Sequence, residues 1–219
     1  MSAQCCASNS SANAARDPRY RRALWIALIV NAAMFLIEIF GGMRSGSTSL
    51  LADAVDFFGD AANYAVALAV LSMAVVWRSR AALAKGLCMG AFGLFVIGKT
   101  AWSMAAGVVP EATTMGTIGF FALLANVGVA ILLYTYRAGD ANMRSVWLCT
   151  RNDAIGNVAV MLAALGVFGT GSAWPDWLVA SLMGVLALSA SISVVRDARR
   201  ELAGAVPVGH VHDHAGHSH

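Results

Sequence analysis

Long apolar stretches dominate this sequence, and they limit what the chain can fold into. A membrane-spanning helix needs roughly 20 mostly apolar residues. Stretches of this kind lie at 23–43, 49–77, 83–108, 115–136, 145–169 and 175–195. Of the 219 residues, 58% are hydrophobic and 12% are charged, whereas an ordinary soluble domain is roughly 25% charged. We therefore predict an all-α integral membrane protein with six transmembrane helices.

The positions of lysine and arginine predict how these helices are oriented. Basic residues gather before the first stretch, in the second and fourth connections and after the last stretch. The other three connections contain one basic residue between them, Arg44. Cytosolic connections carry the excess of Lys and Arg in membrane proteins. We therefore expect both termini in the cytosol, and we expect the protein in the cytoplasmic (inner) membrane of a bacterium.

The two ends of the chain differ in composition from the apolar middle. We predict a cytosolic N-terminal tail over 1–22, a transport domain over 23–196 and a His-rich cytosolic tail over 197–219. The tails carry side chains that can bind metal, namely Cys5, Cys6, His210, His212, His214, His217 and His219. Capture and delivery of metal is the hypothesis for these tails, and a merely solvated tail is the alternative. The net charge of +3 gives no reason to expect a nucleic-acid partner.

Acidic residues interrupt the second apolar stretch at Asp53, Asp56 and Asp60. A charged side chain near the bilayer centre costs at least a few kcal/mol, so such residues normally face a bundle interior and mark an ion or proton path. Asp56 and Asp60 are four residues apart and share one helix face. We predict that this pair forms half of a divalent-cation site. Asp53 lies in the first turns, where the helix dipole favours an acid, and we assign it a structural role.

The fifth stretch supplies a second polar face through Cys149, Asp153 and Asn157, which recur every four residues. At 1.5 Å per residue, Asp60 lies roughly 16 Å below the outer surface and Asp153 roughly 15 Å above the inner surface of a core roughly 30 Å thick. The two faces therefore meet near the middle of the membrane. Cys149 is either a ligand or a small hydrophobic residue, and Asn157 is either a ligand or a hydrogen-bonded bridge between helices.

Two further features concern packing. Glu38 and Lys99 are expected to form a partly buried ion pair, with a guard of the outer mouth as the alternative. Gly86 and Gly90 have the spacing that lets two membrane helices approach closely, and we interpret them as packing residues.

The polar motifs together resemble a known family. An acid at Glu38, two glycines, a Ser-Gly-Ser turn at 45–47, an Asp53-Ala pair and the four-spaced Asp56 and Asp60 are similar to the signature of the cation diffusion facilitator family. The segment Asp153-Ala-Ile-Gly-Asn157 is similar to the family's fifth-helix motif. The resemblance implies a homodimeric exporter that exchanges a cytosolic divalent metal for protons.

The resemblance also assigns roles to residues. Asp56 and Asp60 match the ligand pair of the second helix, and Asp153 matches the aspartate of the fifth. The usual histidine of the fifth helix falls on Cys149 here. We expect this chain to be a short form without the C-terminal cytosolic domain that is usual in the family.

The predicted function is divalent metal efflux. Zinc or cobalt is favoured as the cargo, while cadmium, manganese, nickel and iron stay possible, and no prosthetic group is expected. The alternatives are a membrane metal sensor or storage protein without transport, and a proton-coupled carrier of another cation. An enzyme is not expected, because all five histidines lie in the C-terminal tail and no nucleophile and base pair occurs in a span.

Overall fold

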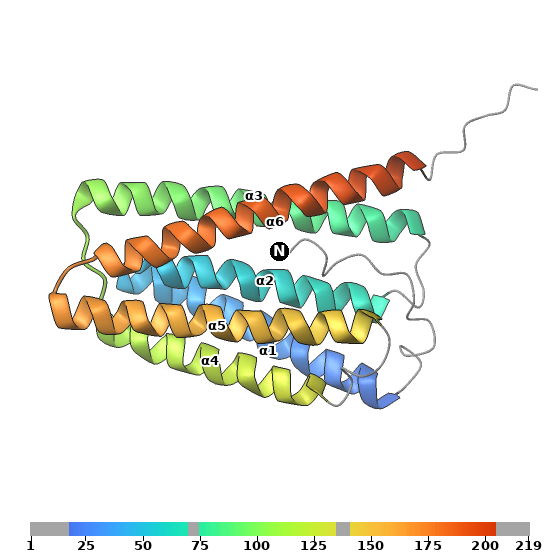
Figure 1. The fold of residues 1–219 in the computed structure, drawn as a ribbon, viewed down its shortest axis with the longest axis horizontal. Coiled ribbons are helices and arrows are strands. Elements are labelled where there is room, and N and C mark those ends of the chain that lie inside the picture. Colours follow the sequence, from blue (N-terminus) through green and yellow to red (C-terminus); the bar gives the residue numbers. More distant parts are fainter. Residues whose placement is uncertain (1–17, 70–74, 135–140, 205–219) are drawn as a thin grey trace, which may run out of the picture.

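The structure of the protein is a computed structural model, and it describes residues 18–69, 75–134 and 141–204, with the side chains of 75, 76, 78 and 141–152 outside the description. The described chain is entirely helical and contains no strand. Its helices are α1 Pro18–Ser45, α2 Thr48–Ala69, α3 Val75–Ala106, α4 Ala112–Tyr134, α5 Ala141–Thr170 and α6 Trp174–Gly204. Successive helices run in opposite directions, so both ends of the helical body lie at the same end of the molecule (Figure 1).

The connections from α1 to α2, from α3 to α4 and from α5 to α6 gather at the other end (Figure 1). The first is two residues long, and it turns at Gly46, whose φ of 74° is in the left-handed region. A glycine adopts this conformation without the penalty that a Cβ atom would bring. Short connections of this kind make α1 and α2 antiparallel neighbours.

Helix α2 lies at the centre of the body (Figure 1). The α3 and α6 helices pack as a pair on one side of it, and α1, α4 and α5 lie on the other. Helix α2 packs against α1, α3, α5 and α6. Any polar side chain on α2 therefore faces other helices on several sides.

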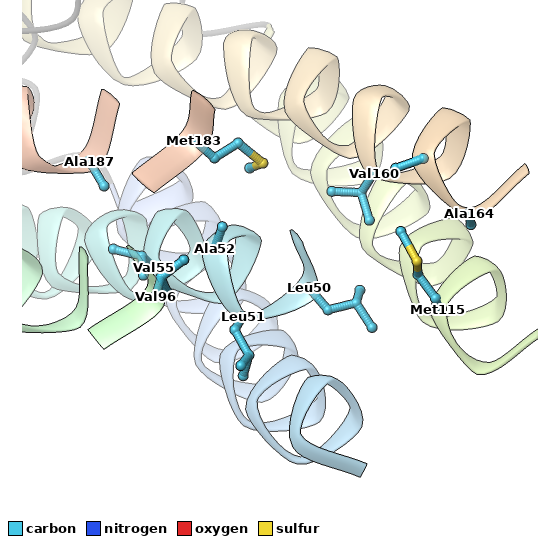
Figure 2. Packing of buried hydrophobic residues seen from close by; sticks show 11 residues of the cluster. Leu50, Leu51, Ala52, Val55, Val96, Met115, Val160, Ala164, Met183 and Ala187 are labelled. Carbon is cyan, nitrogen blue, oxygen red and sulfur yellow. The ribbon is translucent and has the colours of Figure 1, made fainter. Parts of the chain in front are cut away.

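The largest apolar cluster is built around the first half of α2. Figure 2 shows Leu50, Leu51, Ala52 and Val55 of this helix packing with side chains from α3, α4, α5 and α6, namely Val96, Met115, Val160, Ala164, Met183 and Ala187. Each is at most 8% exposed. Burying an aliphatic side chain of this size contributes about 1.5–3 kcal/mol in water, and in lipid close packing takes over that role. The cluster fixes the position of α2 among its neighbours.

The outer surface of the body is apolar. Large hydrophobic side chains such as Ile29, Phe40, Ile131 and Phe168 are each more than 60% exposed. Five helices, α1, α3, α4, α5 and α6, are long and apolar enough in their described parts to cross a membrane. Helix α2 is the exception among the six, and it is the helix that carries three aspartates.

Several predicted boundaries were wrong. The apolar stretch 49–77 is not one helix, because α2 ends at Ala69 and α3 begins at Val75, and the predicted turn at Arg78–Arg80 is helical. Helix α1 begins at Pro18, before its apolar stretch, and α6 continues to Gly204, past its apolar stretch, which leaves the predicted division into tails and transport domain untested. Charged residues at the end of a span do not stop a helix; they only mark where the apolar environment ends.

The predicted close packing at Gly86 and Gly90 is confirmed, and the partner is α6. A Cβ atom added at Gly90 would lie 2.6 Å from the Ser191 hydroxyl oxygen, and one at Gly86 would lie 2.9 Å from a methyl carbon of Val195. Ser191 Oγ also donates a hydrogen bond of 2.7 Å to the Gly86 carbonyl oxygen. The small residues thus let the α3 and α6 backbones approach closely.

Candidate metal site

Three aspartates of α2 face the interior of the helical body. Asp53 is 1% exposed and Asp60 is 7% exposed, while Asp56 is partly buried. Asp56 lies one turn before Asp60 on the same helix face, and its carboxyl group interacts electrostatically with those of Asp53 and Asp60. Three acids on one central helix are costly in a membrane unless a cation, a proton or a donor compensates them.

Asp53 belongs to a chain of buried polar groups drawn from four helices. The side-chain amide of Asn157, on α5, donates a hydrogen bond to Asp53 Oδ2. Asn157 Oδ1 in turn accepts a hydrogen bond of 2.8 Å from Asn126 Nδ2, on α4. Asp53 also interacts electrostatically with the carboxyl group of Glu38, on α1. This polar chain joins α1, α2, α4 and α5 within the bundle.

Asp60, about two turns after Asp53 on α2, has a different set of neighbours. The Tyr64 hydroxyl donates a hydrogen bond of 3.2 Å to Asp60 Oδ2. The ammonium group of Lys85, on α3, interacts electrostatically with Asp60 and donates a hydrogen bond to the side chain of Asn63. A phenol donor and a nearby cation therefore ease the burial of this carboxylate.

Asp153 brings α5 to the same region. Its carboxyl group interacts electrostatically with those of Asp60 and Asp56. Asp153 Oδ2 is buried and has no hydrogen-bond partner. The structure thus places Asp153 near Asp56 and Asp60, the aspartates that the sequence singled out from another stretch.

These acids meet in pairs. Among the described residues, no three side chains of His, Cys, Asp or Glu are arranged to hold a metal ion. Two carboxyl groups in contact repel each other when both are ionised, and a shared proton or a cation removes that repulsion. The arrangement is therefore chemically suited to exchange protons for a cation.

Several predicted site residues lie outside the description. The backbone of Cys149 belongs to α5, one turn before Asp153, but its side chain is among those not described. The tail residues Cys5 and Cys6 and the five histidines of 210–219 also lie outside the described residues. Their part in metal binding stays a prediction.

The expected ion pair between Glu38 and Lys99 is not formed. Glu38 is fully buried, and neither of its carboxyl oxygens has a hydrogen-bond partner. It interacts electrostatically with the carboxyl group of Asp53. The expectation assumed that the outer-half positions of both residues bring them together, but the carboxyl group of Glu38 interacts with Asp53 of α2 instead.

Sequence reasoning missed two residues that organise this region. Asn126 is 2% exposed within an apolar helix, and a lone asparagine in such a helix was the available signal for an interhelical hydrogen bond. Asp176 is fully buried in the first turn of α6. Its position directly after a proline made it look like part of a connection.

Comparisons with known proteins bear on the same architecture. Residues 24–203 match the model of the cation efflux transmembrane domain. The chain belongs to the cation efflux family. A six-helix body with its acids gathered on the central helix and on α5 is thus the form that this family domain takes here.

Curated relatives are metal transporters by name. The metal cation efflux system protein CzcD of Cupriavidus metallidurans is 23% identical over 198 residues, which cover 85% of this chain and 63% of that protein. The zinc transporter ZitB of Escherichia coli is 26% identical over 214 residues, covering 92% of this chain and 68% of ZitB. The cadmium, cobalt and zinc/H(+)-K(+) antiporter of Bacillus subtilis is 25% identical over 193 residues, covering 81% of this chain and 61% of the antiporter.

The chain spans about three-fifths of the length of the first of these relatives. Family membership and the five apolar helices make it an integral membrane protein, and the bacterial relatives support the expected place in the inner membrane. The family is one of transporters rather than an enzyme class.

Proposed function

We propose that this chain exports a divalent metal ion, zinc or cobalt in the first place, in exchange for protons. The observation that carries the proposal is the electrostatic interaction between the carboxyl groups of Asp60, which is buried on α2, and Asp153, which is partly buried on α5, inside a membrane domain. A structural pair at this position is better served by one acid and one base. Two acids suit a site that alternates between protons and a metal ion.

In the proposed cycle, metal enters from the cytosol and is bound by Asp56, Asp60 and Asp153. When the metal leaves to the outside, three neighbouring carboxylates repel one another and take up protons. The protonated site then returns to face the cytosol. Metal and protons compete for the same oxygens, so movement of one in one direction drives the other in the opposite direction.

The fourth ligand in this proposal is Cys149 rather than Asn157. Both polar groups of the Asn157 side chain are engaged, one with Asp53 and one with Asn126, so its oxygen can reach a metal only by giving up a buried hydrogen bond. Cys149 precedes Asp153 by one turn on the same face of α5. A thiolate beside carboxylates favours zinc, cobalt or cadmium over manganese.

Further parts of the proposal rest on the sequence and on the relatives. Both termini are cytosolic, with α2 spanning the membrane inside the bundle, and two copies form a homodimer. The tail cysteines and histidines capture metal near the inner mouth. The names of the relatives, which include zinc, cobalt and cadmium, support this cargo.

The test is metal flux in vesicles that contain only the purified protein. Wild-type vesicles with a zinc indicator inside and an outward proton gradient are expected to accumulate zinc and to lose protons. The Asp60→Ala variant is expected to do neither, whereas Thr117→Val, which changes an exposed hydroxyl that bonds only within α4, serves as the matched control. Zinc accumulation by Asp60→Ala vesicles would overturn the proposed site.

The same experiment separates the alternatives. A sensor or storage protein binds zinc without flux, and a carrier of another cation loses protons without moving zinc or cobalt. Either outcome in wild-type vesicles would replace the export proposal.

A further inference from the structure

Asp176 makes the densest set of hydrogen bonds in the described chain, and none of them lies within its own helix. The residue is in the first turn of α6 and is fully buried. Its Oδ1 accepts hydrogen bonds from Ser47 Oγ at 2.7 Å, Ser49 N at 3.0 Å and Ser49 Oγ at 2.6 Å. Its Oδ2 accepts from Thr48 N at 2.8 Å and Thr48 Oγ1 at 2.9 Å. Five donors therefore converge on one carboxylate.

These donors are the start of α2. The first N–H groups of a helix have no partner within the helix and need an acceptor from elsewhere. Ser47 caps the helix locally, because its hydroxyl accepts a hydrogen bond of 3.2 Å from Leu50 N. The N–H groups of Thr48 and Ser49 are satisfied by Asp176, more than 120 residues away along the chain. The first turn of α2 is thus fixed to α6 rather than only to its own sequence.

This attachment lies close to the acids of the site. Asp53 is five residues past Thr48, which is about 7.5 Å along a helix. A helix is stiff over this length, and a slip of one residue at its start turns every later side chain by about 100°. Such a slip would carry Asp56 and Asp60 away from Asp153.

We propose that Asp176 is a positioning residue for metal binding, which holds the rotation and the depth of α2 so that its acids face α5. The inference rests on the proposed function of those acids. The contact is an anchor that persists through the transport cycle, because breaking it leaves five donors and a carboxylate without partners at the start of two helices.

The chemistry of the contact requires a carboxylate of this length. An asparagine keeps one acceptor oxygen but turns an NH₂ group toward at least two of the five donors, so donor faces donor. A glutamate adds a methylene group where the side chain has no exposed surface. Asp176→Asn is therefore the smallest change that disturbs the anchor.

The first experiment measures cobalt binding by the full-length protein in detergent, through the visible absorption of the bound ion. Asp176→Asn is expected to weaken cobalt binding by about 10- to 100-fold, as loss of a supporting residue does at other metal sites, and to change the shape of the absorption band. The matched control is Asp197→Asn, the same change on the same helix near its other end. Wild-type affinity and spectrum in Asp176→Asn would overturn the proposal.

A second variant tests the anchor independently of the carboxylate and decides the question if Asp176→Asn does not fold. Thr48→Cys with Asp176→Cys replaces the hydrogen bonds by a disulfide. The oxidised double variant is expected to bind cobalt and to move zinc like the wild type, and to lose affinity when reduced. A disulfide form that is folded but does not transport would show that the contact opens during the cycle, and would overturn the anchor. Wild-type vesicles that move no zinc would instead overturn the proposed export function.

Discussion

The acids of this bundle differ in the side chains that surround them. The side-chain NH₂ group of Asn157 donates to Asp53 of α2, and its side-chain oxygen accepts from Asn126 of α4. Two helices therefore set the orientation of the Asn157 amide. Asp60 has a phenol and a nearby ammonium group, whereas Asp153 Oδ2 has no partner. The acids are chemically alike in the sequence, and their neighbours make them different.

At this scale we predict the effect of Asn126→Leu. The substitution removes the donor to Asn157 Oδ1 and leaves a buried carbonyl unsatisfied, which costs about 1–3 kcal/mol. We expect a lower thermal unfolding midpoint in detergent and weaker cobalt binding, because Asn157 and Asp53 lose their fixed orientation. A matched control is Thr117→Val, which removes an exposed polar group that bonds only within the same helix. Unchanged stability of Asn126→Leu would contradict the bridging role.

A second prediction concerns the proposed fourth ligand. Cys149→Ser replaces a soft thiolate by a hard hydroxyl. We expect the initial rates of zinc and cadmium transport in vesicles to fall. The rate of manganese transport is expected to rise relative to the rates for zinc and cadmium. Cys88→Ser, on an exposed position of α3, is the control and should leave the order of metals unchanged. The same order in Cys149→Ser would exclude Cys149 as a selectivity residue.

At the scale of helices, α3 and α6 form a closely packed pair with glycines at their contact. We predict that Gly90→Val destabilises the protein by about 1–3 kcal/mol, the usual cost of overpacking, because even a Cβ atom meets the Ser191 hydroxyl at 2.6 Å. The unfolding midpoint in detergent measures the effect. Gly98→Val, at a position on the same helix where a Cβ atom meets nothing within 4 Å, should change it little.

How much of these helices the sequence predicts depends on the physics of each feature. The apolar stretches predicted six helices in the right order. A segment inside lipid must satisfy its backbone hydrogen bonds internally, so an apolar stretch of this length forms a helix. The division of the stretch 49–77 between α2, which ends at Ala69, and α3, which begins at Val75, was missed, because the sequence between these two residues contains no glycine or proline and is as apolar as its surroundings. Hydropathy reports the environment of a segment and not where its helix ends.

The candidate site was predictable in part for the same reason. Four-residue spacing places Asp56 with Asp60, and the depth count places Asp153 near them, because both depend only on helix geometry. The interaction of Glu38 with Asp53 and the hydrogen bond of Asn126 to Asn157 depend on how four helices rotate against one another. No local pattern in one sequence contains that information.

For the whole molecule, the pairing of acids predicts how metal binding depends on pH. In the proposed site, protons and metal compete for the same carboxylates, so lowering the pH is expected to weaken metal binding and raising it to strengthen it. We expect cobalt titrations at a series of pH values to show more than one proton released per ion bound, because at least two acids are involved. A metal affinity that does not change with pH would rule out exchange at this site.

An even number of alternating helices places Pro18 and Gly204 at the same end of the body (Figure 1). Two copies can therefore be encoded as one continuous polypeptide, joined by a flexible linker, without adding a further membrane crossing. Such a tandem chain can carry Asp60→Ala in one half only. Half the wild-type flux would mean that each copy works alone, and no flux would mean that the two copies turn over together.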